Sequence, residues 1–196
     1  MPRIVSGAAL CVVVALAAAC ASSPPSRFYT LSPTASAGTT TSKLSVVVGP
    51  VSMPALVDLP QIVVSTGPNQ VSIDEFNRWA SPLSNNISRV VAENLVLLLG
   101  TPRVSQFQQS LNADADFRVA IEVQSFESAP GEAATLNAAW LVRRTRDGKA
   151  ETGRTTVREP AGDKGYDALA AAHSRALGRM SQDIADAVRT LDRAAP

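Results

Sequence analysis

The sequence has 196 residues, of which 45% are hydrophobic and 18% are charged, and its formal net charge is +1. This length and apolar content suffice for one ordinary globular domain with a real core. The nearly neutral balance of charge argues against a nucleic-acid partner.

The first twenty residues differ in kind from the rest of the chain. Arg3 is the only charged side chain before position 27, and Ile4–Ala19 is a run of apolar and small residues. A membrane-spanning helix needs about 20 apolar residues, and a basic start, an apolar middle and a small-residue exit are typical of a secretory signal peptide. Residues 1–19 are therefore predicted to be a signal peptide, with an uncleaved anchor as the alternative.

Cys20 stands at the border between this apolar run and a polar, Ser/Pro-rich stretch. In bacterial lipoproteins, which this border resembles, small residues lead directly to a cysteine that is acylated and becomes the first residue after cleavage. Ala17 replaces the leucine that is usual three places before that cysteine. Because Cys11 would leave with the signal peptide, the mature chain would hold one thiol and no internal disulfide. We therefore predict lipid attachment at Cys20, with a chance cysteine as the alternative.

The segment 20–43 is predicted to be the lipidated cysteine and a spacer. Ser and Pro dominate residues 21–26, which cannot pack a core. Residues 27–31 form a brief apolar patch that could dock as a strand, and 32–42 is expected to be a loop. In enteric lipoproteins an Asp after the cysteine favours retention at the inner membrane, so Ala21 points, by that resemblance, to the outer membrane.

Residues 44–192 are predicted to form a single domain. Alternating or β-branched apolar residues predict strands at 44–51, 61–66, 71–73, 103–107, 116–124, 136–142 and 150–158, the last as an edge strand. Helical spacing predicts a helix that Ser84 or Asn85 caps and Gly100 ends, and a second helix over 166–191. This order predicts the α/β class, with α+β-like character: a mixed, antiparallel-rich sheet covered by two main helices.

Side chains that could carry catalysis are scarce. The one histidine, His173, lies on the apolar stripe of the final predicted helix and is interpreted as a core residue. Without a second histidine, a zinc site is not expected, and the chain has neither a glycine-rich phosphate loop nor a G-x-S-x-G motif. Asp114 and Asp116 flank a strand start, where acids commonly serve as turn residues. We therefore predict no catalytic residue, metal or cofactor.

Two groups of residues are candidates for binding a partner. Six basic residues gather on the hairpin that Asp147-Gly148 is predicted to close in two residues: Arg143, Arg144, Arg146, Lys149, Arg154 and Arg158. They could contact anionic headgroups or an acidic partner, although the preferred interpretation is that they protect a sheet edge from unwanted pairing.

The second group is Arg78 and Trp79, which precede the first predicted helix, after Asp74 and Glu75 at an expected strand-to-helix junction. Trp and Arg are enriched in binding hot spots, but a Trp packed under the helix start is an equal alternative. We retain Arg78, Trp79, Arg143 and Arg144 as candidate partner-binding residues.

Several stretches stand in one order along the chain. They are the lipoprotein-like start with Cys20, FYTLSP at 28–33, VVVGPVSMPALVDLPQIVVSTGPNQV at 46–71, NRWASPLSNNISRVVAENL at 77–95, and the Ala-rich final helix. Together these features resemble the ABC-type transport auxiliary lipoprotein family over about residues 28–190. Most of the resemblance is carried by Pro54–Val63 and by Arg78–Leu83, a match to Arg-Trp-Ala-x-Pro-Leu.

The resemblance implies a lipoprotein on the periplasmic face of the outer membrane, in a system that moves lipids between the two membranes. Its partners would be an MCE-domain periplasmic protein and an inner-membrane permease or ABC transporter, and the family's assemblies make a homo-oligomer an option. No catalytic residue is carried over. The alternatives are a periplasmic shuttle that holds lipid itself, which would need a sizeable apolar cavity, and, on weaker grounds, an envelope hydrolase.

Overall fold

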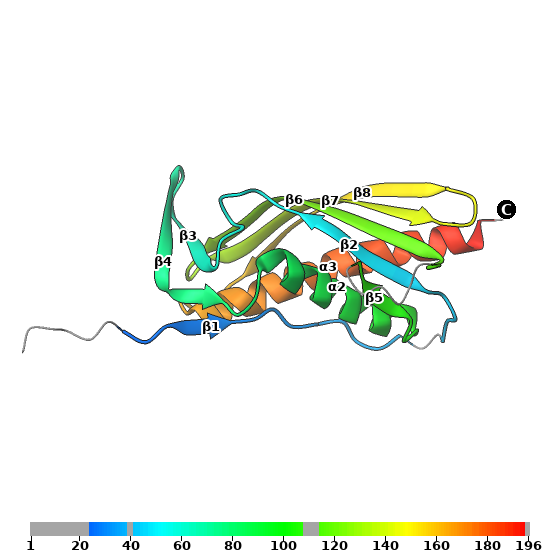
Figure 1. The fold of residues 1–196 in the computed structure, drawn as a ribbon. Coiled ribbons are helices and arrows are strands. Elements are labelled where there is room, and N and C mark those ends of the chain that lie inside the picture. The colour runs from blue at the N-terminus through cyan, green and yellow to red at the C-terminus, as the bar shows by residue number, and fades with distance from the viewer. Residues whose placement is uncertain (1–23, 39–40, 108–113, 195–196) are drawn as a thin grey trace, which may run out of the picture.

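The computed structural model describes residues 24–38, 41–107 and 114–194, and Figure 1 shows how its elements are arranged. Its described part contains two helices, α2 (Leu83–Leu99) and α3 (Tyr166–Arg193). The strands of the same part are β1 (Arg27–Tyr29), β2 (Val46–Ser52), β3 (Gln61–Gly67), β4 (Gln70–Trp79), β5 (Val104–Gln106), β6 (Phe117–Ala129), β7 (Ala133–Arg144) and β8 (Ala150–Pro160).

Five strands form the main sheet, in the order β5-β2-β6-β7-β8. β2 pairs in parallel with both β5 and β6, whereas β6, β7 and β8 form antiparallel pairs. α2 packs against β2 and β5, α3 packs against β7 and β8, and the two helices contact each other. Both helices therefore cover the same face of the sheet (Figure 1), a point that the sequence left open.

The alternation of apolar side chains explains which face is covered. Along β6 and β7 every second side chain is buried toward the helices, and a register shift at Gln124 keeps Phe126 in the core. The stripe predicted for the last helix is buried throughout: Leu169, His173, Leu177, Met180, Ile184, Val188 and Leu191. The predicted fold class is confirmed, with a mixed, antiparallel-rich strand arrangement and two helices around one core.

The remaining three strands form a second, smaller sheet in the order β1-β4-β3. β3 and β4 make the predicted hairpin, in which Gly67 faces Gln70 across the turn. β1 adds in parallel to β4, so the apolar patch after the spacer does dock as a strand. The sequence suggested one sheet, but this hairpin stands at one end of the main sheet instead of joining it (Figure 1). An alternating pattern shows which face of a strand is buried, not which strand it pairs with.

Of the two ends predicted for the first helix, one is confirmed and the other is wrong. Gly100 ends α2 with the left-handed φ of 63°, as predicted. The predicted cap at Ser84 or Asn85 is wrong, because α2 begins at Leu83 and follows Pro82 without any side-chain cap bond. The fixed φ of proline leads the chain into the helix without a capping hydroxyl or amide.

Two further local predictions are corrected at turns. Asp74 and Glu75 lie within β4 and not at a strand-to-helix junction. The β7–β8 turn is longer than two residues, because the N–H of Arg144 donates to the carbonyl of Lys149 at 2.8 Å and encloses residues 145–148. Gly148 supplies the positive φ of 75° that this longer turn requires.

The segment after β1 has no regular structure but is tied to both helices. The N–H groups of Thr34 and Ala35 donate to Oδ1 of Asn94 on α2, at 2.9 and 3.0 Å. The N–H of Ser32 donates to Oγ of Ser174 on α3 at 3.1 Å. Because the chain is held in this way from β1 onward, only the residues before Arg27 can act as a free tether.

Candidate docking surfaces

Cys20, the predicted attachment residue, lies outside the described residues, so its role stays a prediction. The structure does describe where the chain that follows it enters the domain: β1 begins at Arg27, opposite Asn77 of β4. No helix in the described ranges is long and apolar enough to cross a bilayer.

Trp79 and Arg78 are neighbours at the end of β4 but lie in different environments. The Trp79 side chain is only 6% exposed and packs edge-on against Phe126, with ring centroids 6.2 Å apart. It belongs to the core, as the packing interpretation expects, and offers little surface to a partner. Arg78 is partly exposed; its Nε donates to the Glu75 carbonyl at 2.9 Å, and Nη2 lies 3.6 Å from Oε2 of the same residue.

Asp74 holds a kink in β4 just before Arg78. Its Oδ1 accepts hydrogen bonds from the N–H groups of Phe76 and Asn77, at 2.9 and 2.8 Å, and its Oδ2 accepts one from the Tyr166 hydroxyl at 2.7 Å. The pairing with β3 skips residues 75–77, which form a bulge. Burial opposes ionisation, but these hydrogen bonds outweigh it and lower the pKa of Asp74 below its ordinary value.

Arg144 is buried, with 2% of its surface exposed. Its Nε and Nη2 donate to the two carboxylate oxygens of Asp147 at 3.0 and 2.5 Å. Its Nη1 donates to the carbonyls of Leu191 and Ala194 at the end of α3. The hydrogen bond from Arg144 holds the pKa of Asp147 at about 2. Arg144 therefore ties α3 to the β7–β8 turn and has no guanidinium group free for a partner.

Other basic side chains around that turn remain at the surface. Arg143 and Arg146 are exposed, and Lys149 lies 3.9 Å from Asp147. Arg118 of β6 faces Arg143 in the register of the sheet, on the face that the helices leave uncovered. We call these four residues, Arg118, Arg143, Arg146 and Lys149, the distal basic surface.

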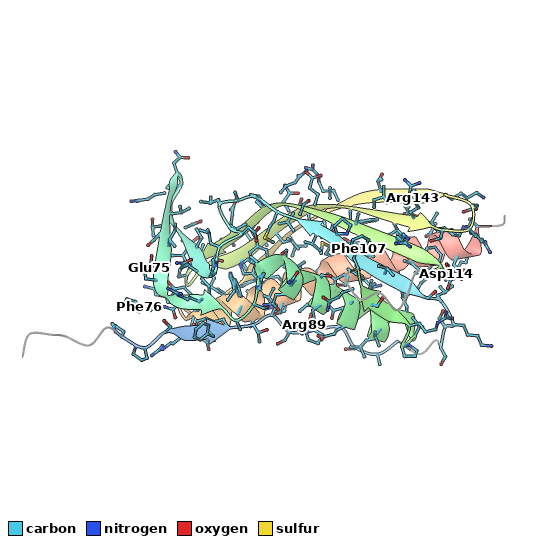
Figure 2. The ribbon with its side chains drawn as sticks, in the orientation of Figure 1. Glu75, Phe76, Arg89, Phe107, Asp114 and Arg143 are labelled. Carbon is cyan, nitrogen blue, oxygen red and sulfur yellow. The ribbon has the colours of Figure 1, made fainter. Side chains whose placement is uncertain are left out.

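The candidate residues lie at opposite ends of the molecule. β6 has 13 residues, which corresponds to about 40 Å of extended strand. Its first residue pairs with Arg144, beside the distal basic surface. Its last residue, Ala129, lines a cleft together with Ser65–Pro68 at the β3–β4 turn. Figure 2 accordingly shows Arg143 toward one end and Glu75 and Phe76 at the other.

His173 lies in the core, as predicted from its place on the apolar stripe. It stacks on Phe126 with ring centroids 3.7 Å apart, and its Nε2 shares a 2.8 Å hydrogen bond with Oγ of Ser128. Complete burial lowers the pKa of His173 to about 3, so the ring is neutral at physiological pH. Because Ser128 is buried as well, this serine–histidine pair has no surface that a substrate could reach.

The acidic residues at the start of β6 have structural contacts. Oδ2 of Asp116 accepts hydrogen bonds from the N–H and the hydroxyl of Ser45, at 2.8 and 2.7 Å. Burial acts to raise the pKa of Asp116, but the bonds from Ser45 outweigh it and lower the pKa. These contacts join the starts of β2 and β6. Asp114 is exposed, and the described ranges hold no group of His, Cys, Asp and Glu residues that could bind a metal ion.

Sequence reasoning missed one group of surface residues. Val71, Ile73 and Phe76 of β4 and Phe28 of β1 are large apolar side chains that the structure leaves exposed. The alternation of Val71 and Ile73 was visible in the sequence, but it does not reveal whether their face of the strand is covered.

The comparisons with known proteins agree with this fold. A family model for the ABC-type transport auxiliary lipoprotein component matches residues 29–185. A crystal structure of an uncharacterized protein is 21% identical, with a TM-score of 0.69, over 84% of this chain and 99% of its own. Protein XCC0632 from Xanthomonas campestris, of family DUF330, is 19% identical, with a TM-score of 0.69, over 86% of this chain and 100% of its own. A comparison with curated proteins finds no match.

Proposed function

The chain belongs to the family of ABC-type transport auxiliary lipoprotein components, and we propose that it is a non-catalytic subunit of an intermembrane lipid transport system. In this proposal Cys20 anchors the chain to the outer membrane. The folded domain then docks an MCE-domain periplasmic protein, which connects to an inner-membrane permease or ABC transporter.

The opposite placement of the tether and the distal basic surface is the observation that supports this proposal best. β1, which follows the tether, lies at the end of the molecule that carries the β3–β4 hairpin (Figure 1). Arg143, Arg146 and Lys149 surround the β7–β8 turn at the other end. A chain held to a membrane at Cys20 would thus present its basic surface toward the periplasm.

The distal basic surface suits an acidic partner surface. The carboxylate on the turn, Asp147, is already engaged by Arg144, whereas Arg146 also interacts electrostatically with Asp116 at the start of β6. Complementary charge speeds encounter and suppresses wrong partners more than it adds affinity. We therefore expect the docking partner to carry Asp and Glu residues where it meets this surface, and we expect the association to weaken as salt is raised.

A pull-down from the native host, with the anchor intact, tests this function. The wild-type chain is expected to recover an MCE-domain protein. The double variant Arg143→Glu, Arg146→Glu is expected to recover at least tenfold less, because two like-charge contacts would each cost about 1 kcal/mol or more. Arg158→Glu is the matched control, since Arg158 is an exposed arginine near the other end of β8, 3.6 Å from Glu132.

The two parts of the proposal fail in different ways. If the wild-type chain recovers no MCE-domain protein, the transport role proposed here is wrong. If the double variant recovers as much as the wild type, the role stands but the partner meets another surface. Lipid that co-purifies in stoichiometric amount with the chain would instead favour the shuttle.

A further inference from the structure

Large apolar side chains gather at the tethered end of the molecule. Of the six that are exposed among the described residues, four lie on β1 and β4: Phe28 at 65%, Val71 at 45%, Ile73 at 46% and Phe76 at 39% exposure. We call these four residues the end surface. Monomeric proteins rarely leave apolar groups together at their surface unless something covers them.

The two faces of the β3–β4 hairpin explain why this group is unusual. Ile62 and Val64 of β3 point into the main core. Ile73 faces Val63 in the antiparallel register, and Val71 faces Ser65, so Val71 and Ile73 lie on the opposite face. The solvent face of such a hairpin is normally polar. Here it carries Val63, Val71 and Ile73; Val63 is buried, whereas Val71 and Ile73 stay exposed.

Hydrogen bonds fix the backbone conformation around Phe76. The bulge at 75–77 presents it, and Asp74 fixes that bulge by accepting the N–H of Phe76 and the hydroxyl of Tyr166 on α3. The bond from Arg78 to the carbonyl of Glu75 closes the same turn. The backbone at Phe76 therefore has a defined position and places the side chain at the end of the molecule, where Figure 2 shows it.

The length of the tether decides what can cover this surface. Six residues, Ala21–Ser26, separate the predicted attachment point at Cys20 from Arg27 at the start of β1, which makes seven steps from residue to residue. Even when fully extended they span at most about 25 Å. Arg27 and Phe28 pair directly with Asn77 and Arg78 of β4, so the bilayer that receives the acyl chains lies within this reach of Phe28 and Phe76, at the β1 end of the end surface.

We infer that the end surface lies in the interfacial region of the anchoring bilayer and sets the orientation of the domain. Apolar side chains bury their surface at the boundary between headgroups and acyl chains. The domain is then attached to the bilayer in two ways, through the acylated Cys20 and through these side chains. Together they fix the angle between the long axis of the molecule and the membrane, which the lipid anchor alone would leave free. The inference rests on the lipid anchor of the proposed function.

The test uses the full-length lipidated protein in vesicles of phosphatidylethanolamine and phosphatidylglycerol. Because Cys20 would be acylated and Cys11 removed, a Val71→Cys substitution would introduce the only free thiol, which is then labelled with a fluorophore. We expect brominated lipids to quench this label and aqueous iodide to reach it poorly. The matched control is Phe107→Cys, since Phe107 is an exposed phenylalanine, at 55%, outside the end surface. Its label should show the reverse behaviour.

A second variant tests the contribution of the aromatic rings. Phe28→Ser with Phe76→Ser should raise iodide quenching at position 71 at least threefold while the protein stays on the vesicles through its acyl chains. Both side chains are exposed, so these changes should leave the fold intact, which a thermal melt would check. An unchanged quenching pattern would contradict the inference.

The same quenching experiment gives different results if something other than the bilayer covers the end surface, or if nothing does. A label at position 71 that iodide reaches freely in the anchored protein overturns the inference but leaves the anchor in place. A label that is shielded from iodide but not quenched by brominated lipid shows a protein there, either a second copy or a partner, and also overturns it. Failure of the lipid anchor itself would appear separately, as a bare Cys20 in mass spectrometry and loss of the chain from the vesicles, and would overturn both proposals.

Discussion

At the residue scale, the ion pair between Arg144 and Asp147 fixes the shape of the distal end. Among the described residues, Arg144 is the largest of the fully buried side chains. It donates hydrogen bonds to two carbonyl groups at the end of α3 and to the carboxylate of Asp147. A buried charge that loses its partner is strongly destabilising. The exposed neighbours Arg143 and Arg146 owe their positions to this buried contact, because it holds the turn that carries them.

Asp147→Asn should lower the melting temperature at pH 7 and have a much smaller effect at pH 2, where the folded carboxyl is already about half protonated. The pKa of Asp147 is about 2 in the folded chain, below its ordinary value of 3.8, so the pair stabilises the fold above about pH 4. That contribution is lost as pH falls toward 2. Thermal melts at each pH measure it, with Asp58→Asn at an exposed position as the control. A constant difference across this range would contradict the assignment.

His173 should make the wild-type chain sensitive to mild acid. Because burial lowers its pKa from 6.5 to about 3, the unfolded chain takes up a proton below pH 6.5 that the folded chain refuses. Stability should fall by about 1.4 kcal/mol per pH unit over this interval from this residue. In His173→Phe this part of the slope should vanish, as measured by urea unfolding at pH 7, 6 and 5.

The substitution at His173 also leaves the Ser128 hydroxyl unpaired, which would cost about 1–3 kcal/mol at neutral pH. The double variant with Ser128→Ala removes that hydroxyl and should recover part of the loss. If His173→Phe kept the wild-type dependence on pH, the acid sensitivity would have to come from other groups.

At the element scale, β8 depends on a close fit between Gly153 and Trp140 of β7. The two residues are opposite each other in the register, and an added Cβ at position 153 would lie 2.2 Å from the indole ring. The indole Nε1 donates to Oγ1 of Thr155 at 3.1 Å, and Thr155 donates to Asp183 on α3 at 2.5 Å. The edge strand is thereby connected to the helix beneath it.

Gly153→Ala should therefore destabilise the domain by about 1–3 kcal/mol, because the indole ring must move and strain its bond to Thr155. Urea unfolding followed by tryptophan fluorescence measures the change. Gly67→Ala is the matched control, since a Cβ at that strand end meets its nearest neighbour at an ordinary 3.7 Å. Equal stability of the two variants would show that Trp140 has room to shift.

At the scale of the whole molecule, the long main sheet separates a tethered end from a basic end. β1 and the β3–β4 hairpin lie at one end, and the β7–β8 turn and the C-terminus of α3 lie at the other (Figure 1). The segment after β1 is hydrogen-bonded to Asn94 and Ser174. The tether can therefore become longer only if these hydrogen bonds break and the segment detaches from the domain. The proposed anchor thus acts at a fixed point on the folded domain.

Mass spectrometry of the protein from its native host should find the chain beginning at Cys20, with a diacylglyceryl group on the sulfur. Cys20→Ala should release the chain from the membrane fraction, because a thioether to the lipid can no longer form and the described domain has no membrane-spanning helix. A chain that keeps residues 1–19, or that carries an unmodified thiol, would contradict the anchor.

The sequence by itself determined which residues face inward, because burial of one face imposes a period of 2 on strands and 3.6 on helices. It therefore predicted the stripe through His173 and Leu177, the end of α2 at Gly100, the edge position of β8 and the α+β class. These features follow from the pattern of residues that are close together in the sequence. The expected cap at Ser84 failed because Pro82 starts the helix without one.

Only the tertiary structure decided what the candidate site residues do. Arg143 and Arg144 are equivalent in the sequence, yet Arg144 is buried because the end of α3, almost fifty residues later, supplies its acceptors. In the same way, Trp79 is in the core because Phe126 packs on it, while Val71 and Ile73 are exposed because their hairpin forms a separate sheet. Pairing partners and charge partners come from distant parts of the chain, and no local pattern encodes them.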